Sequence, residues 1–278
     1  MKCFYKIIIA AVLLINAVTV NYSYACGTPV RKGAYVISTT FSYFSSTKKW
    51  DANGKAEDYA NNGYFNSGGV ALYGEYGASR QATLIASIPY SYNTFGQTSG
   101  KSITQGIGDA EVGARYYLGN VDFKFYVAVQ GTMVVPLYNS NSNQLGFGAF
   151  GAEFKLIGSG NAPTGDESSI FYSLDAGVRQ YFNETGPFQF RSTAQLGYGI
   201  DKENTISFSA TGIVSNSSNK TFANNILQNK DFRYLNATAS IGHVFAPALV
   251  VYINYTKFFV GTNTGIGSNA SLSFITRF

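Results

Sequence analysis

Cysteine and histidine are scarce in this chain. Among its 278 residues these two types occur only as Cys3, Cys26 and His243. Cys3 lies in an N-terminal segment that we expect to be removed, and a single remaining cysteine excludes an internal disulfide and a cysteine-based metal site. A lone histidine with no visible ligand partners gives no metal site either, so we expect no cofactor.

Charge is also in short supply. Charged residues make up 13% of the sequence, and the net charge of +5 falls to +3 once Lys2 and Lys6 are subtracted. No basic patch is present, which excludes a nucleic-acid partner. Aromatic residues reach 16%, with 21 Tyr, 22 Phe and 30 Gly. This composition is typical of a membrane β-barrel, because half of each strand faces hydrocarbon.

Long apolar runs are limited to the N-terminus. Lys2 and Lys6 precede nine apolar residues at 7–15, and small residues follow at Ser23 and Ala25. This order predicts a signal peptide over residues 1–25 and a mature barrel over 26–278.

Two alternatives concern the same segment. A transmembrane anchor would need about 20 apolar residues, whereas Asn16 and Thr19 interrupt this run. Acylation of Cys26 is a minor alternative, since the preceding residues 23–25 lack the aliphatic side chain usual at such sites.

The rest of the chain alternates polar and apolar residues with a period of two. We predict an all-β fold, an antiparallel up-and-down transmembrane barrel of about twelve strands. The expected strands cover residues 34–44, 69–76, 82–92, 107–118, 123–135, 147–156, about 172–179, 188–200, 205–214, 232–245, 249–259 and 270–278.

The last of these strands is expected to close the barrel. Its apolar face carries Leu272 and Phe274, and its other face carries Ser271, Ser273 and Arg277. The small polar face matches Ser38, Thr40 and Ser42 of the first strand, so we predict that the two strands pair.

Connection lengths give a second indication. Long connections at 45–67, 93–105 and 215–230 alternate with short ones at 77–81, 119–120 and 246–247. Long outer loops and short periplasmic turns are typical of outer-membrane barrels. Two connections break the alternation, because 158–167 is long for a turn and 183–187 is short for a loop, so strand counts of ten or fourteen stay open.

A soluble β-sandwich would also alternate. Aromatic residues at expected strand ends instead indicate the two interfacial girdles of a membrane barrel. The chain is therefore predicted to lie in the bacterial outer membrane, with outer-membrane lipid around it. The girdle residues are Tyr43, Tyr92, Tyr116, Phe123, Tyr181, Phe188, Tyr198, Phe245, Phe258 and Phe278.

Two segments carry a resemblance. Residues 106–118 read GIGDAEVGARYYL, and residues 72–90 read LYGEYGASRQATLIASIPY. With the strand layout of residues 34–278, they resemble the family of outer-membrane proteins named for the meta-pathway of phenol degradation. The resemblance implies an outer-membrane barrel and movement of small aromatic or other hydrophobic compounds. At residues 78–80 the chain has Ala-Ser-Arg where that family would have a polar Thr-Asp type turn.

Charged side chains on the inward register are the candidate binding and selectivity residues. Glu75, Arg115, Lys124, Glu153 and Lys155 are expected near the periplasmic end, where mutual pairing would plug the barrel floor. Alternatively Arg115, Arg179 and Arg191 form a constriction with their acidic partners. The full set is Glu75, Asp109, Glu111, Arg115, Lys124, Glu153, Lys155, Asp175, Arg179 and Arg191.

These features predict a channel or transporter for small solutes, hydrophobic or aromatic in character, that catalyses no reaction. Lumen contacts are expected from Tyr73, Tyr126 and Tyr252. One alternative is a closed barrel that acts in adhesion through the loops 45–67 and 215–230. A third, an outer-membrane phospholipase, would depend on His243 and a serine partner.

Overall fold

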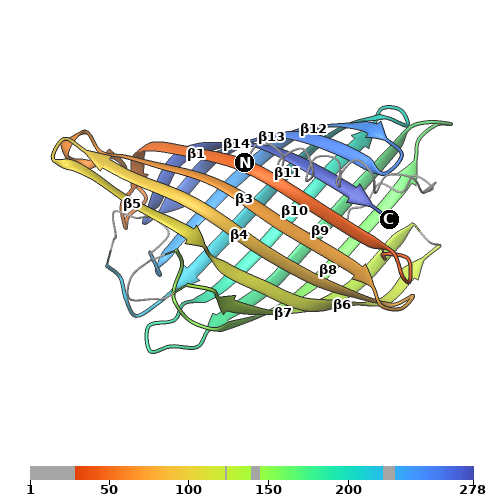
Figure 1. The fold of residues 1–278 in the computed structure, drawn as a ribbon, viewed down its shortest axis with the longest axis horizontal. Helices are drawn as coiled ribbons and strands as arrows, with labels where there is room; N and C mark the ends of the chain where they lie inside the picture. Colours follow the sequence, from red (N-terminus) through yellow and green to blue (C-terminus); the bar gives the residue numbers. More distant parts are fainter. Residues whose placement is uncertain (1–28, 123, 139–144, 222–228) are drawn as a thin grey trace, which may run out of the picture.

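A computed structural model describes residues 29–122, 124–138, 145–221 and 229–278 as a β-barrel whose strands run obliquely to its long axis (Figure 1). Every neighbouring pair in the ring is antiparallel. The ring consists of β1 (Tyr35–Trp50), β3 (Tyr64–Gly77), β4 (Ala82–Gln97), β6 (Asp109–Val121), β7 (Phe125–Pro136), β8 (Gly151–Pro163), β9 (Ser169–Tyr181), β10 (Phe188–Gly199), β11 (Asn204–Asn216), β12 (Phe232–Ala246), β13 (Leu249–Thr262) and β14 (Thr264–Arg277).

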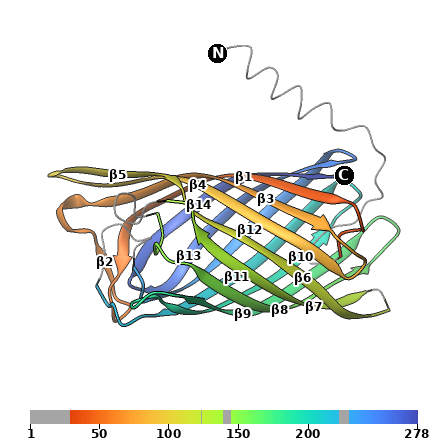
Figure 2. The ribbon, with the colours of Figure 1, turned by 60° about the horizontal axis from the view of Figure 1, so that its bottom comes forward.

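Two strands of the fourteen-stranded sheet lie outside the ring, which leaves twelve. They are β2 (Ala56–Asp58), paired with β1, and β5 (Gly100–Ile107), paired with β4. Both extend one end of the barrel, together with the short 3-10 helix η1 (Ala60–Asn62) (Figure 2). The predicted twelve-stranded antiparallel barrel is confirmed.

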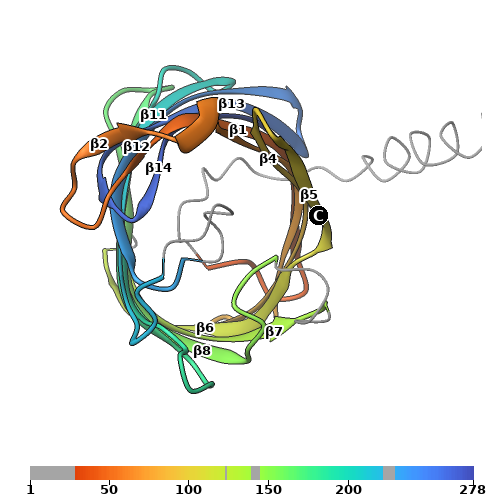
Figure 3. The same ribbon diagram turned by 90° about the vertical axis from the view of Figure 1, so that its left-hand side faces the viewer.

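The first and last strands close the ring (Figure 3). Thr40 pairs with Ser273 and Ser42 with Ser271, and the hydroxyls of Thr40 and Ser273 lie 2.9 Å apart inside the barrel. On the outside, the rings of Phe41 and Phe274 meet edge to face at 6.2 Å. The predicted pairing of the closing strand is therefore confirmed. Because closure leaves no strand edge in the hydrocarbon, the backbone groups of these strands are satisfied within the barrel.

The two barrel ends differ. One end, here the inner end, carries the short connections 78–81, 122–124, 164–168, 200–203 and 247–248, and there the amide of Tyr35 bonds the carbonyl of Phe278 at 3.0 Å. The opposite, outer end carries β2, β5 and the longer connections, together with short ones at 182–187 and Asn263. By the usual pattern of outer-membrane barrels, the inner end faces the periplasm.

The structure corrects the anomalous connection at 158–167. Strand β8 continues to Pro163 and β9 begins at Ser169, so the turn covers only 164–168. The end of β8 is polar and glycine-rich, so it lacks the apolar alternation that predicts a strand. The connection after β9 is short, as predicted, and covers 182–187.

Two expected loops are largely strand. The segment 93–105 contributes the end of β4 and most of β5. These two strands pair from Gln97 with Gly100 at the tip to Tyr90 with Ile107. The tip of this hairpin projects beyond the ring (Figure 2), where residues 100–103 are exposed on both faces and no apolar alternation marks the strand. The segment 260–268 is also not a loop, because Asn263 (φ 50°) turns β13 directly into β14.

The outer surface of the ring is apolar, as the alternation predicts. Leu174, Phe208 and Ile253 each expose more than 60% of their surface on the outward register. The girdle positions Tyr43, Tyr92, Tyr116, Phe188, Tyr198 and Phe245 are also exposed. An exposed apolar band around a closed barrel places the chain in the outer membrane. In the described parts of the chain, no helix is long and apolar enough to span a membrane.

Two girdle assignments are wrong. Tyr181 is buried against inward-facing Val134, and the Phe258 ring contacts inward-facing Tyr234 at 5.0 Å. Both side chains fall on the inward register of their strands, so neither can lie at the lipid interface. The expected signal peptide, Cys26 and Phe123 lie outside the described residues.

A lipid-facing charge tests this surface. Leu174→Arg, near the middle of β9, is expected to lower the free energy of unfolding by about 2–4 kcal/mol, because a guanidinium near the bilayer midplane loses its hydration. Reversible urea unfolding in lipid vesicles measures the change, with Leu174→Met as the matched control. Equal stability of the arginine and methionine variants would show that this face does not contact hydrocarbon.

Candidate functional site

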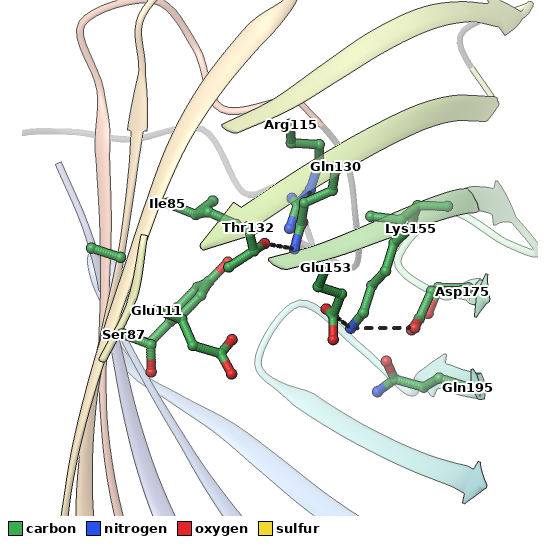
Figure 4. A pocket seen from close by; sticks show the side chains of 14 residues that line it. Ile85, Ser87, Glu111, Arg115, Gln130, Thr132, Glu153, Lys155, Asp175 and Gln195 are labelled. Atoms are coloured by element: carbon green, nitrogen blue, oxygen red, sulfur yellow. Dashed lines mark hydrogen bonds and ion pairs between the residues drawn. The ribbon is translucent and has the colours of Figure 1, made fainter. Parts of the chain in front are cut away.

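One wall of the lumen carries two groups of ion-paired side chains. They come from β3, β6, β8, β9 and β10 and are termed the charged cluster: Glu75, Glu111, Arg115, Glu153, Lys155, Asp175, Arg179 and Arg191. Five of them, Glu111, Arg115, Glu153, Lys155 and Asp175, line a cavity of about 330 Å³ with Gln130, Thr132 and Gln195 (Figure 4). Antiparallel pairing and inward alternation therefore bring together side chains up to 116 residues apart in sequence (Glu75 to Arg191).

Glu153 is the centre of the cluster. Its carboxylate accepts hydrogen bonds from Arg179 Nε at 2.7 Å and Arg191 Nη1 at 3.1 Å, and lies 3.2 Å from Lys155 Nζ. Only 2% of its side chain is exposed. A buried carboxylate is stable in the charged form only when paired and hydrogen-bonded, and three cations meet that need here.

Two further acids balance the cations around Glu153. Arg179 Nη2 donates to Glu111 Oε1 at 2.6 Å, and Arg179 Nη1 donates to the Tyr181 hydroxyl at 3.3 Å. Lys155 Nζ lies 3.6 Å from Asp175. The guanidinium of Arg179 is thus held on both sides and fixed to the wall.

Arg115 forms a second fixed centre. It pairs with Glu75 at 3.2 Å and donates from Nε to Gln130 at 3.1 Å. The Tyr73 hydroxyl donates to the same Glu75 carboxylate at 2.5 Å, which completes the group. Because the wall holds both Arg115 and Arg179, the more exposed cations, Lys155 (21%) and Arg191 (27%), are the ones that solute would meet.

The structure places two candidate residues away from the cluster. Lys124 lies exposed in the turn between β6 and β7, so it belongs to the inner rim of the barrel. Asp109 lies at the outer end of β6, beside Gly146 and the Tyr138 hydroxyl.

The height of the cluster also differs from the prediction. Glu153 and Lys155 are the third and fifth residues of β8, which starts at the outer end, so they do not form a floor at the periplasmic end. The prediction failed because it ended that strand at residue 156 instead of Pro163.

A segment that the sequence did not reveal narrows the outer end of the lumen. Residues 145–150 precede β8, and Phe147 packs edge to face on the inward Tyr181 at 4.8 Å. Ala149 is buried against Val134, and the amide of Gly148 donates to the Tyr138 hydroxyl at 2.9 Å. The apolar pattern predicts that Phe147 begins a strand, whereas the structure places it in the connection before β8.

The opposite wall carries few charges, and Arg277 lies on its inward register near the inner end of β14. Small polar groups meet there, with the hydroxyls of Thr238 and Thr256 2.8 Å apart and the Asn254 amide donating to Ser271 at 3.1 Å. The lumen is therefore asymmetric, with an ionic wall facing a wall of mainly uncharged polar groups, termed the uncharged wall.

Aromatic rings line the outer half of the uncharged wall. Phe258 contacts Phe44 at 5.5 Å and Tyr234 at 5.0 Å, and Tyr234 stacks on Phe232 at 5.9 Å. These four residues are termed the aromatic strip. Phe44 reaches across β14 only because residue 267 is a glycine, since any side chain there would collide with the Phe44 ring.

His243 takes a structural position on the outward face near the inner end. Its Nδ1 lies 2.9 Å from Asn204 Oδ1, and its ring meets Phe245 edge to face at 4.7 Å. The Asn204 amide also donates to Asp201, which keeps the pKa of that carboxyl below its usual range. These contacts fix the adjoining turn and bring no serine hydroxyl to the imidazole.

Comparison with solved structures places this geometry among outer-membrane barrels. An outer membrane channel from Pseudomonas putida F1 matches with a TM-score of 0.68 at 10% identity, covering 93% of this chain and 100% of that one. The translocator domain of the autotransporter NalP from Neisseria meningitidis gives 0.53 at 13% identity, covering 90% of each chain. The NanC porin gives 0.51 at 11% identity, covering 86% of this chain and 98% of that one.

At these identities the shared property is the fold. No protein-family model matches the chain, and no curated protein does so significantly. The resemblance to the phenol meta-pathway family thus receives support only at the level of an outer-membrane barrel.

The central carboxylate gives a direct test of the cluster. Glu153→Gln leaves three cations around a neutral amide and is expected to cost about 3–5 kcal/mol of unfolding free energy. The control Glu167→Gln breaks the exposed 2.7 Å pair with Lys202 and is expected to cost at most about 1 kcal/mol. Urea unfolding in vesicles compares the two, and equal losses would contradict the central role of Glu153.

Proposed function

We propose that the protein is an outer-membrane channel for small solutes. The observation that carries this proposal is the lumen itself, in which an ionic wall with a cavity of about 330 Å³ faces an uncharged wall. A twelve-stranded barrel is wider than the eight-stranded kind that side chains fill, and narrower than sixteen-stranded porins. Passage would then depend on the side chains of the lumen.

The charged cluster supports a constriction better than a plug. Its pairs stay on the β3–β10 side of the ring, from the neighbours β8 and β9 (Glu153 with Arg179) to β6 and β9 (Glu111 with Arg179). Because these side chains pair along one wall, they do not extend across the lumen to the opposite wall. Solute would pass between Arg191 and Lys155 on one side and hydroxyl groups on the other.

The aromatic strip points to the solute class. Rings on the uncharged wall offer apolar faces to a flat solute, and the charged cluster opposite would orient a polar substituent. We therefore propose small hydrophobic or aromatic compounds, in agreement with the sequence resemblance. No reaction is assigned, since the contacts of His243 are those of a structural residue.

Uptake by liposomes tests the proposed solute class. Phe258→Ala removes the ring that links Phe44 to Tyr234 and is expected to reduce uptake of a phenol-sized aromatic about two- to tenfold. Uptake of a sugar of similar size is expected to change little. The matched control is Phe259→Ala, which shortens the adjacent, outward-facing ring.

The two variants separate lumen from lipid effects. The proposal predicts that Phe258→Ala reduces uptake of the aromatic more than uptake of the sugar. It also predicts that Phe259→Ala changes the uptake of neither solute. Absence of solute uptake by the wild-type protein would refute the channel, and equal loss of both solutes would refute the aromatic preference.

A further inference from the structure

A second cavity lies outside the lumen, at the outer end of the barrel. Its volume is about 510 Å³, within the range of about 300–1,000 Å³ of small-molecule sites. It forms where the connection from β1 to β3 folds back on both strands, and is termed the loop cavity. Its lining is Ser45, Thr47, Asp58, Tyr59, Asn62, Gly63, Tyr64 and Asn66.

The loop cavity is held in shape by packing. The Tyr59 ring meets Phe95 edge to face at 5.7 Å and shares a buried cluster with Phe65. The carbonyl of Asn61 accepts hydrogen bonds from the Thr98 amide at 3.0 Å and the Thr98 hydroxyl at 2.8 Å, which ties η1 to the β4–β5 hairpin. Asn61 and Asn62 both have positive φ, 56° and 52°, a conformation that such contacts must maintain.

The chemistry of the lining is that of hydrogen bonding. Seven of the eight lining residues carry a hydroxyl, amide or carboxylate group, and two of the seven are tyrosines. Ordinary ligand pockets are mainly apolar with few polar groups. A lining that combines hydroxyl, amide and carboxylate groups with aromatic rings suits a ligand that offers many hydroxyl groups and also apolar C–H faces.

Two polar atoms of this lining, the Tyr59 hydroxyl oxygen and Asn66 Oδ1, make no hydrogen bond with any described residue. Asn66 Oδ1 is shielded from solvent and accepts no hydrogen bond from any described residue. A buried acceptor without a donor costs free energy. Rotation of the Asn66 side chain toward the loop cavity would let a ligand hydroxyl bond Oδ1 and remove that cost.

The position relative to the membrane narrows the ligand further. Ser45 and Asn66 pair directly and lie two residues beyond Tyr43 and Tyr92, which belong to the exposed girdle. Two residues of strand rise about 7 Å. The loop cavity therefore lies just above the outer edge of the hydrocarbon.

We propose that the loop cavity binds a saccharide unit at the outer surface of the membrane. Asn66 accepts a sugar hydroxyl, Asp58 and Asn62 bond neighbouring hydroxyls, and a tyrosine ring covers an apolar sugar face. Two sources share this chemistry, the sugars of the surrounding lipopolysaccharide and free oligosaccharides outside the cell.

Calorimetric titration of the purified full-length barrel in detergent tests the site. One arm uses the core oligosaccharide released from lipopolysaccharide, and the other uses a linear glucose oligomer. Saturable binding in either arm is expected and supports the site, and the arm that binds identifies the source. Absence of saturable binding in both arms overturns the proposal.

Variants separate a binding role from a structural one. Asn66→Ala is expected to weaken saccharide binding at least about tenfold without lowering the unfolding free energy, because its Oδ1 makes no hydrogen bond in the free protein. Asp58→Asn is expected to weaken binding as well, whereas Glu57→Gln, on the same strand but outside the lining, is the matched control. Wild-type affinity in both Asn66→Ala and Asp58→Asn would overturn the site.

Discussion

The need to satisfy every backbone hydrogen bond within the hydrocarbon governs this structure. An open sheet would leave an edge in lipid, so β14 must pair with β1 and close the ring. At this junction the two strands place small hydroxyl groups inside the barrel and phenylalanine rings outside it. Once the ring is closed, each strand has one lipid face and one lumen face, and the alternation of side chains follows.

Closure also determines how the lumen can hold charge. Inward side chains on nearby strands lie close enough to pair. Glu153 therefore pairs with Arg179 of β9, Arg191 of β10 and Lys155 of its own strand. Isolated charges there would lose hydration without compensation. Pairing along one wall fixes the arginines and leaves the facing wall to hydroxyl groups and the aromatic strip. The resulting asymmetry is the basis of the proposed solute path.

Alternation predicted what lies at membrane depth, because there the two faces of a strand have different surroundings. It gave the twelve strands, the outward apolar band and the inward register of Glu75, Glu111, Arg115 and Arg179. It failed beyond the membrane. Residues 100–103 of β5, beyond the girdle residue Tyr92, are exposed on both faces, and Gly265 and Gly267 gave the start of β14 the composition of a loop.

Other features were not readable from a local pattern. The height of Glu153 in the barrel depends on where β8 ends, and the inward path of residues 145–150 depends on contacts with Val134 and Tyr181. Tyr181 and Phe258 resembled girdle residues because they lie near strand ends, but their register turns them into the lumen. The loop cavity likewise depends on how the connection after β1 folds back, which no residue spacing specifies.

Recording from planar lipid bilayers tests the central claim, that the lumen is an open path. The account predicts discrete current steps of constant size from the folded wild-type protein. It also predicts a reversal potential near zero in a salt gradient, because four acidic and four basic residues of the charged cluster balance. A folded barrel that inserts into the bilayer and gives no current steps would contradict it.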